Sequence, residues 1–187
     1  MFNNKKIAVA VLMATGILAS AGASAQSYVG ASVGQSKWAV DCSGATSCSD
    51  TDTAYKVFGG YNFSQNLAVE ATYSSLGTIN ATVGTISADI KASSFDVAAM
   101  FKAPVSKDWV LFAKLGVGAV KGEVDASMGS VSGSTTKNAT QAVAGVGAIY
   151  NVGQDFGIRA DIDTRKVDLV GSSGNVTNVS IGAQVSF

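Results

Sequence analysis

Histidine is absent from the 187 residues of this chain. Its absence excludes catalytic systems in which an imidazole activates a serine or a cysteine, and it excludes histidine metal sites. Proline is rare as well, with Pro104 as the single example, and charged residues make up only 14% of the chain. We therefore predict that the protein is not an enzyme and that it holds no metal or cofactor.

Long hydrophobic runs are limited to the N-terminus, which has the three parts of a secretory signal peptide. Lys5 and Lys6 precede an apolar run, Ile7–Leu18, and the small residues Ala23-Ser24-Ala25 follow it. A helix that spans a bilayer needs about 20 apolar residues, and this run is shorter. We predict that residues 1–25 are cleaved and that residues 26–187 form one domain. Without its two leader lysines the chain carries 11 basic and 13 acidic residues, so nothing favours nucleic-acid binding.

Alternation of apolar and polar residues is the main pattern of the remaining chain. In the hairpin 54–77, for example, Tyr55, Val57 and Tyr61 share one parity and Lys56 lies on the other. A period of two predicts β-strands. Eight strands are predicted in all, two of them in this hairpin and the others at 28–39, 91–103, 109–122, 140–151, 156–167 and 175–187.

The connections between these segments alternate in length. Tight turns are predicted at 62–66, 104–108 and 151–155, where Asn, Ser, Gly, Asp and Pro gather. Longer polar loops are predicted between them, at 40–52, 78–89, 123–138 and 168–174. Short turns at one end, long loops at the other and an even strand count are typical of an outer-membrane barrel. The predicted fold is an all-β, eight-stranded antiparallel up-and-down transmembrane β-barrel.

The segment 156–167 predicts which face of the strands is outside. Its charged residues share one parity, and Phe156, Ile158 and Ile162 share the other. Arginine or lysine on the lipid face costs about 2–4 kcal/mol at the midplane, so the charges are expected to face the lumen. Periodicity alone leaves open the alternative of a soluble, lipocalin-like barrel, with the apolar face inside and the charged face in water. Aromatic residues near the strand ends favour the membrane barrel. The predicted interior charge network comprises Lys56, Glu70, Asp96, Lys102, Lys114, Arg159, Asp161, Asp163 and Arg165.

The C-terminal residues 180–187 alternate up to a terminal aromatic, with Gly182, Val185 and Phe187 at the positions of an outer-membrane assembly signal. Together with the segments 55–77 and 109–120, this ending resembles the OmpA-like transmembrane domain and, more broadly, small eight-stranded barrels of the OmpX/Ail type. The resemblance implies an outer-membrane location, insertion by the barrel-assembly machinery, contact with lipids and lipopolysaccharide, and a lumen closed by ion pairs.

One position departs from that family pattern in the interior charge network. Glu70, Lys114 and Arg159 occupy positions like the family's interior charges, but Ile149 stands where such barrels usually carry an acid. We therefore expect the partner of Lys114 to be Asp96 or Asp161.

The remaining expectations concern the outer loops. Cys42 and Cys48 lie in the first long loop, and two cysteines in an exported protein favour a disulfide. With no catalytic set in view, the sequence predicts a structural or surface-interaction protein that contacts an extracellular ligand through its loops. A small passive pore for ions or small solutes is the alternative.

Overall fold

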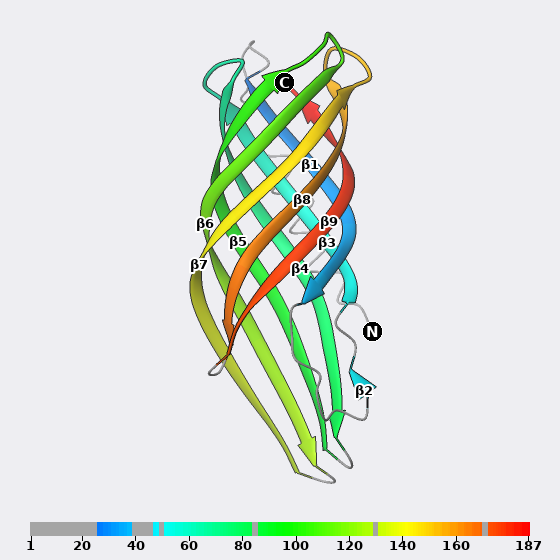
Figure 1. Ribbon diagram of the computed structural model, residues 1–187, viewed down its shortest axis with the longest axis vertical. Helices are drawn as coiled ribbons and strands as arrows, with labels where there is room; N and C mark the ends of the chain where they lie inside the picture. Colours follow the sequence, from blue (N-terminus) through cyan, green and yellow to red (C-terminus); the bar gives the residue numbers. More distant parts are fainter. Residues whose placement is uncertain (1–25, 39–46, 49–50, 84–85, 129–130, 170–171) are drawn as a thin grey trace.

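Alternating side chains form nine strands in the part of the chain that the computed structural model describes, residues 26–38, 47–48, 51–83, 86–128, 131–169 and 172–187. The predicted signal peptide lies outside these residues. In the described part of the chain there is no helix long and apolar enough to cross a membrane. The strands are β1 (Ser27–Trp38), β2 (Ser47–Cys48), β3 (Thr51–Asn62), β4 (Leu67–Val83), β5 (Ile86–Pro104), β6 (Trp109–Met128), β7 (Val131–Asn151), β8 (Phe156–Leu169) and β9 (Ser172–Ser186) (Figure 1).

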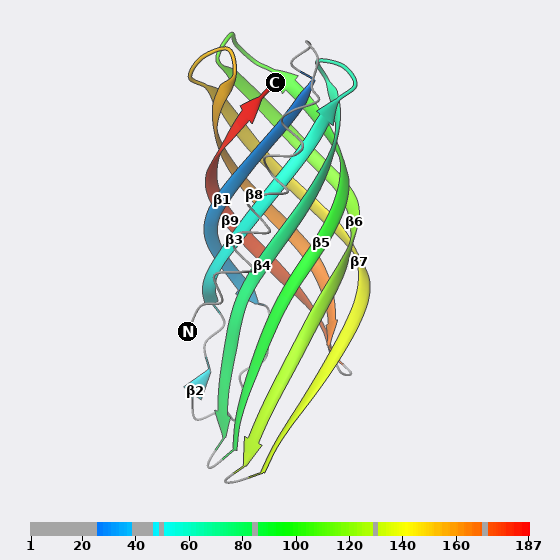
Figure 2. The same cartoon turned by 180° about the vertical axis from the view of Figure 1, so that it is seen from behind.

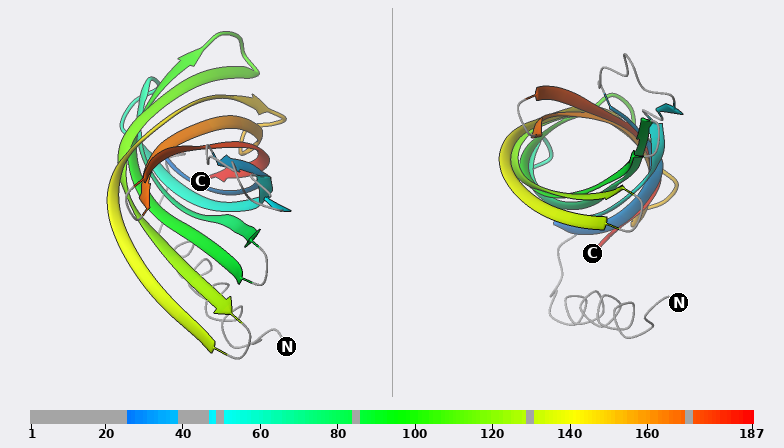
Figure 3. Two further views of the ribbon diagram at one scale, coloured as in Figure 1. Left: turned by 60° about the horizontal axis from the view of Figure 1, so that its bottom comes forward. Right: turned by 90° about the horizontal axis from the view of Figure 1, so that it is seen from below.

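The eight long strands close into a barrel (Figure 2). Each pairs antiparallel with the next along the chain, β4 pairs with β5, and β9 pairs with β1 to complete the ring. Seen from below, the strands encircle a single lumen (Figure 3). The two-residue β2 adds only to the outer part of β4, where Ser47 is opposite Thr82. The predicted eight-stranded antiparallel up-and-down barrel is confirmed.

One end of the barrel carries the short turns and the two ends of the described chain. The Asn62 N–H donates to the Gln26 carbonyl at 2.6 Å, and the Phe187 N–H donates to the Ser27 carbonyl at 2.9 Å. These bonds tie the first and last strands together beside the turn that follows β3. We call this the turn end, and the opposite one the hairpin end.

Three of the predicted long loops are wrong. In the shortest, 168–174, β8 and β9 stay paired out to Leu169 and Ser172. Strands β4 and β5 stay paired out to Val83 and Ile86, and β6 and β7 stay paired out to Met128 and Val131. The residues expected to form the loops 78–89 and 123–138 thus lie largely in two strand pairs that project beyond the barrel wall (Figure 1). Polar composition suggested loops, but these segments also contain Thr and Val, which favour extended backbone.

Burial alternates along the barrel strands, as the predicted faces require. Outward positions carry large apolar side chains, with Val57 57% and Leu115 60% exposed. Four charged side chains of β8 face inward and are at most 4% exposed, namely Arg159, Asp161, Asp163 and Arg165. Aromatic residues flank this outward apolar band. They are Tyr55, Tyr73 and Phe95 toward the hairpin end, and Tyr61, Phe63, Phe101, Trp109, Tyr150 and Phe156 toward the turn end. Such paired girdles are typical of barrels that cross a bilayer.

Placing a charge at the centre of this band tests the assignment of faces. Leu115→Arg is expected to lower the free energy of unfolding by about 2–4 kcal/mol, because the guanidinium would sit in hydrocarbon. Thr53→Arg, which is outward but beyond Tyr55, is the control and should cost about 0–1 kcal/mol. Urea unfolding in phospholipid vesicles measures both values. Equal costs would contradict a lipid-facing band at Leu115.

Candidate functional site

The lumen is filled by buried charges of both signs. Among the described residues, four basic and four acidic side chains inside the barrel are at most 5% exposed, so the buried charge balances. They project from five strands, β3, β4, β5, β6 and β8. They are Lys56, Lys114, Arg159, Arg165, Glu70, Asp96, Asp161 and Asp163.

Arg159 on β8 is almost fully buried and joins opposite walls of the barrel. Its guanidinium donates to both carboxylate oxygens of Glu70 on β4, Nη1 to Oε2 at 2.5 Å and Nη2 to Oε1 at 3.0 Å. Its Nε donates to Asp161 Oδ2 at 3.0 Å. The rings of Phe58 and Phe112 lie over the guanidinium, with centroids 4.3 and 4.4 Å from Cζ. The bidentate geometry and the two stacked rings are contacts that arginine makes and lysine cannot reproduce.

A second cluster surrounds the two aspartates of β8. Lys56 on β3 pairs with Asp161 and, at 2.6 Å, with Asp163 Oδ2. Lys114 on β6 lies 2.7 Å from Asp163 Oδ1. The Ser180 hydroxyl donates to Asp161 Oδ1 at 2.5 Å. Each aspartate therefore faces more than one donor, which offsets the cost of burying its charge.

The partner expected for Lys114 was wrong, and a glycine explains why. Instead of Asp96 or Asp161, the ammonium pairs with Asp163 and lies 3.7 Å from Glu70 Oε1. In the strand register, Lys114 is opposite Gly145, which is in turn opposite Asp163. A Cβ at position 145 would come within 2.8 Å of Lys114 Cε. The missing side chain on β7 lets Lys114 reach an acid one strand further away.

The last ion pair lies nearer the hairpin end. Arg165 Nη1 is 3.2 Å from Asp96 Oδ2, and the same nitrogen donates to the Ser94 hydroxyl. Lys102 differs from the other predicted members because it is only half-buried. Its ammonium donates to Asn62 Oδ1 at 2.5 Å, near the turn end.

Apolar side chains are buried inside the barrel on both sides of the charges, a feature that the sequence interpretation missed. One cluster lies toward the turn end, and Arg159 stacks against two of its rings. The other lies toward the hairpin end, where Val176 is opposite Arg165 in register. Ile149, noted only as lacking an acid, belongs to the first cluster. The clusters are Tyr28, Phe58, Ala68, Met100, Phe112 and Ile149, and Trp38, Leu76, Ala92 and Val176.

The other predicted sites are partly described. Cys42 lies outside the described residues and the side chain of Cys48 is not described, so their disulfide stays a prediction. Of the C-terminal positions, Gly182 abuts β1, where an added Cβ would meet the Ala31 carbonyl oxygen at 2.1 Å, and Val185 faces outward. Their role in assembly also stays a prediction. In the part searched, no group of acidic or cysteine side chains is arranged to hold a metal ion.

A model of the family described as "Outer membrane protein beta-barrel domain" matches residues 7–187. Comparison with curated protein sequences gives no match. Among solved structures, Neisserial surface protein A is similar with a TM-score of 0.68 and 16% identity, over 89% of this chain and 100% of that one. Ail of Yersinia pestis has a TM-score of 0.56 and 20% identity, over 87% and 99%. OprG of Pseudomonas aeruginosa has a TM-score of 0.57 and 13% identity, over 89% and 98%.

Neutralising single aspartates tests the pairing in the lumen. Asp163→Asn should cost about 3–5 kcal/mol of unfolding free energy, because it leaves the ammonium groups of Lys56 and Lys114 buried with one partner fewer each. Asp108→Asn, at an exposed position of the turn before β6, is the control and should change the free energy of unfolding by less than about 0.5 kcal/mol. Urea unfolding in vesicles measures both. A cost at Asp163 as small as that at Asp108 would contradict the assignment of Asp163 as the shared acid.

Proposed function

The chain belongs to the family of the outer membrane protein beta-barrel domain, and from this membership we propose that it works in the outer membrane as a closed barrel that makes contacts at the cell surface. Barrels of this type turn short connections toward the periplasm and long ones outward. The projecting pairs β4–β5 and β6–β7 would then stand on the outer surface of the cell.

The filling of the lumen by buried charged and apolar side chains carries this proposal. A conducting path would have to pass two apolar clusters and the ion-paired layer between them. An eight-stranded barrel is just wide enough for side chains to fill its interior. Transport through the lumen would require breaking buried ion pairs, whereas surface contact requires no change in the barrel. The packing therefore supports a structural or surface-interaction role over the passive pore.

The projecting hairpins supply the contact surface. Along β7, the pairing with β8 begins only at Val143, so in the described part of the chain Val131–Ala142 pair with β6 alone. An extended hairpin with a free edge offers backbone donors and acceptors to a partner. Ail, the attachment invasion locus protein of Yersinia pestis, has been crystallised with the heparin analogue sucrose octasulfate. That complex supports testing sulfated polysaccharide as an extracellular ligand here.

The outer-membrane location also implies other partners. The apolar band contacts membrane lipid, and we propose that the wall also meets lipopolysaccharide, the lipid of the outer leaflet. Insertion would use the barrel-assembly machinery, with Gly182, Val185 and Phe187 as the signal that it recognises.

Two measurements on the full-length protein test the proposal together. In planar bilayers we expect no discrete conductance steps, because the lumen is filled. Bacteria that display the protein should adhere to heparin-coated plastic more strongly than bacteria without it. Removal of 124–135 from the β6–β7 hairpin should abolish this increase in adherence. Removal of the β4–β5 tip, residues 79–90, is the comparison, and heat-modifiable gel migration checks that both variants fold.

The outcomes separate the two candidate functions. Discrete conductance would favour the pore and contradict the closed lumen. Equal adherence with and without both hairpins would contradict a role for these hairpins in surface contact.

A further inference from the structure

A polar hollow lies at the turn end of the barrel, beside the turn between β3 and β4. It has a volume of about 420 Å³ and is lined by Gln26, Asn62, Phe63, Ser64, Gln65 and Lys102. The Lys102 ammonium lies 5.9 Å from the centroid of the Tyr28 ring, and the Tyr28 hydroxyl donates to Glu70 at 2.9 Å. Tyr28 therefore stands between the hollow and the ion pairs of the lumen.

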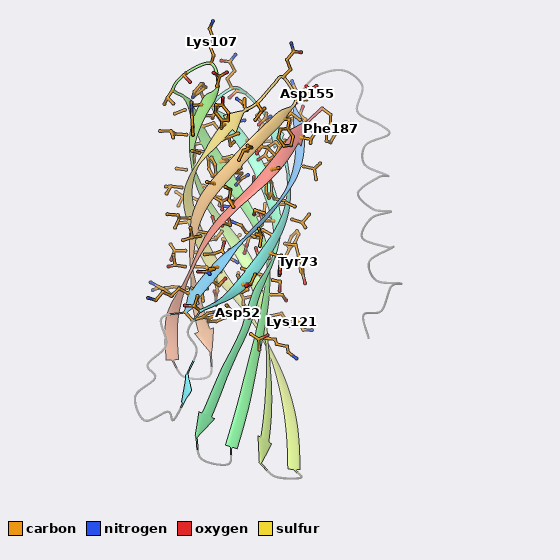
Figure 4. All side chains as sticks on the ribbon, turned by 90° about the vertical axis from the view of Figure 1, so that its right-hand side faces the viewer. Asp52, Tyr73, Lys107, Lys121, Asp155 and Phe187 are labelled. Atoms are coloured by element: carbon orange, nitrogen blue, oxygen red, sulfur yellow. The ribbon has the colours of Figure 1, made fainter. Side chains whose placement is uncertain are left out.

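Lys102 gives the hollow a positive charge that the protein does not balance nearby. The other four inward basic side chains are matched by four acids, whereas the Lys102 ammonium donates to the neutral amide oxygen of Asn62 at 2.5 Å. The carboxylates of the described turn end are those of Asp108, Asp155 and the C-terminal Phe187, and none of them lines the hollow. Figure 4 shows Asp155 and Phe187 at this end of the barrel.

The acceptors around the hollow are already in use, so its remaining polar groups are donors. Asn62 Oδ1 accepts from Lys102. Gln26 Oε1 accepts from the Tyr61 hydroxyl, and Ser64 Oγ accepts from two backbone N–H groups of its own turn, at 3.2 and 3.1 Å. The NH₂ groups of the two amides, the serine O–H and two N–H bonds of the ammonium remain available. Donors gathered around a positive charge suit an anion.

The turn that forms the hollow is held in place by its own hydrogen bonds and by β5. The N–H groups of Phe63 and Ser64 both donate to the Leu67 carbonyl, at 2.9 and 3.1 Å. The Lys102 N–H donates to the Asn66 carbonyl at 2.9 Å, and Asn66 Nδ2 donates back to the Lys102 carbonyl at 2.9 Å. The Phe63 ring, which is 63% exposed, supplies an apolar flank. A hollow that is formed in advance loses less entropy on binding.

We propose that this hollow binds the carboxylate of a small organic acid, with Lys102 and the Asn62 NH₂ group on its two oxygens and the Phe63 ring against its apolar part. The ammonium and the amide are bonded to each other, so they offer adjacent donors to the two oxygens of one carboxylate. The cleavage predicted before Gln26 would add an α-ammonium group at the same edge and strengthen the attraction. From the proposed function the inference takes only the orientation, which places the turn end in the periplasm.

Titration of the purified protein in phosphatidylcholine nanodiscs with phenylacetate, followed by NMR, tests the site. Phenylacetate should bind saturably and shift the side-chain amide signals of Asn62. Phenylacetamide, which has the same shape without the charge, should bind about tenfold more weakly, and Lys102→Gln should weaken phenylacetate binding about tenfold, as expected for hydrogen bonds to a charged group. Lys107→Gln, at an exposed position of the turn before β6, is the matched control and should change binding less than about twofold.

The variant Asn62→Asp separates binding from folding. Its carboxylate would pair with Lys102 inside the hollow, so binding of phenylacetate should be lost, whereas heat-modifiable gel migration should stay that of the parent. Because this variant keeps both hairpins, its adherence to heparin should also equal that of the parent. The carboxylate site and the surface contact can therefore fail separately.

Four results would overturn the proposal. They are the absence of saturable phenylacetate binding, equal binding of phenylacetamide, undiminished binding by Asn62→Asp, and an equal loss with Lys102→Gln and Lys107→Gln. Equal affinity for inorganic phosphate would show a site for any small anion and would overturn the assignment to a carboxylate.

Discussion

The structure depends on the burial of the Arg159 guanidinium in the middle of the barrel. A charge without water is costly, and here Glu70, Asp161 and two aromatic rings replace its hydration. Because Glu70 is on β4 and Arg159 on β8, this one contact spans the lumen. A one-residue slip of β8 would move all of its inward charges to the lipid face. The same interaction therefore fills the barrel and fixes the register of its strands.

Small residues make this filling possible. Gly145 leaves space for Lys114 to reach Asp163, and at Gly118 an added Cβ would lie 1.9 Å from Asp96 Oδ1. With the charges matched in number, the apolar clusters above and below can exclude water from them. In the proposed role the filled barrel is the support, and the projecting hairpins outside the lumen make the contacts.

Much of this architecture could be predicted from the sequence, because alternation and charge parity act strand by strand. The parity of Arg159 and Asp161 was enough to assign faces throughout the barrel. The partner of Lys114 could not be predicted, since it depends on which residues align across three strands. The two apolar clusters were missed for the same reason, and the length of the hairpins was missed because Ser, Thr and Gly suit both loops and exposed strands. Gly145, which is opposite Lys114, was the feature that could have indicated Asp163 as the partner of Lys114.

The central claim is that Glu70 and Arg159 stabilise the barrel as a pair, and a double-mutant cycle tests it most directly. Glu70→Gln, Arg159→Met and the double variant would be unfolded with urea in phospholipid vesicles. The double variant keeps Lys56 with Asp161 and Lys114 with Asp163, so the remaining buried charges stay balanced. The closed-lumen account predicts a coupling free energy of about 2–3 kcal/mol, at the upper end for residues in contact. Costs that add to within about 0.5 kcal/mol would contradict it.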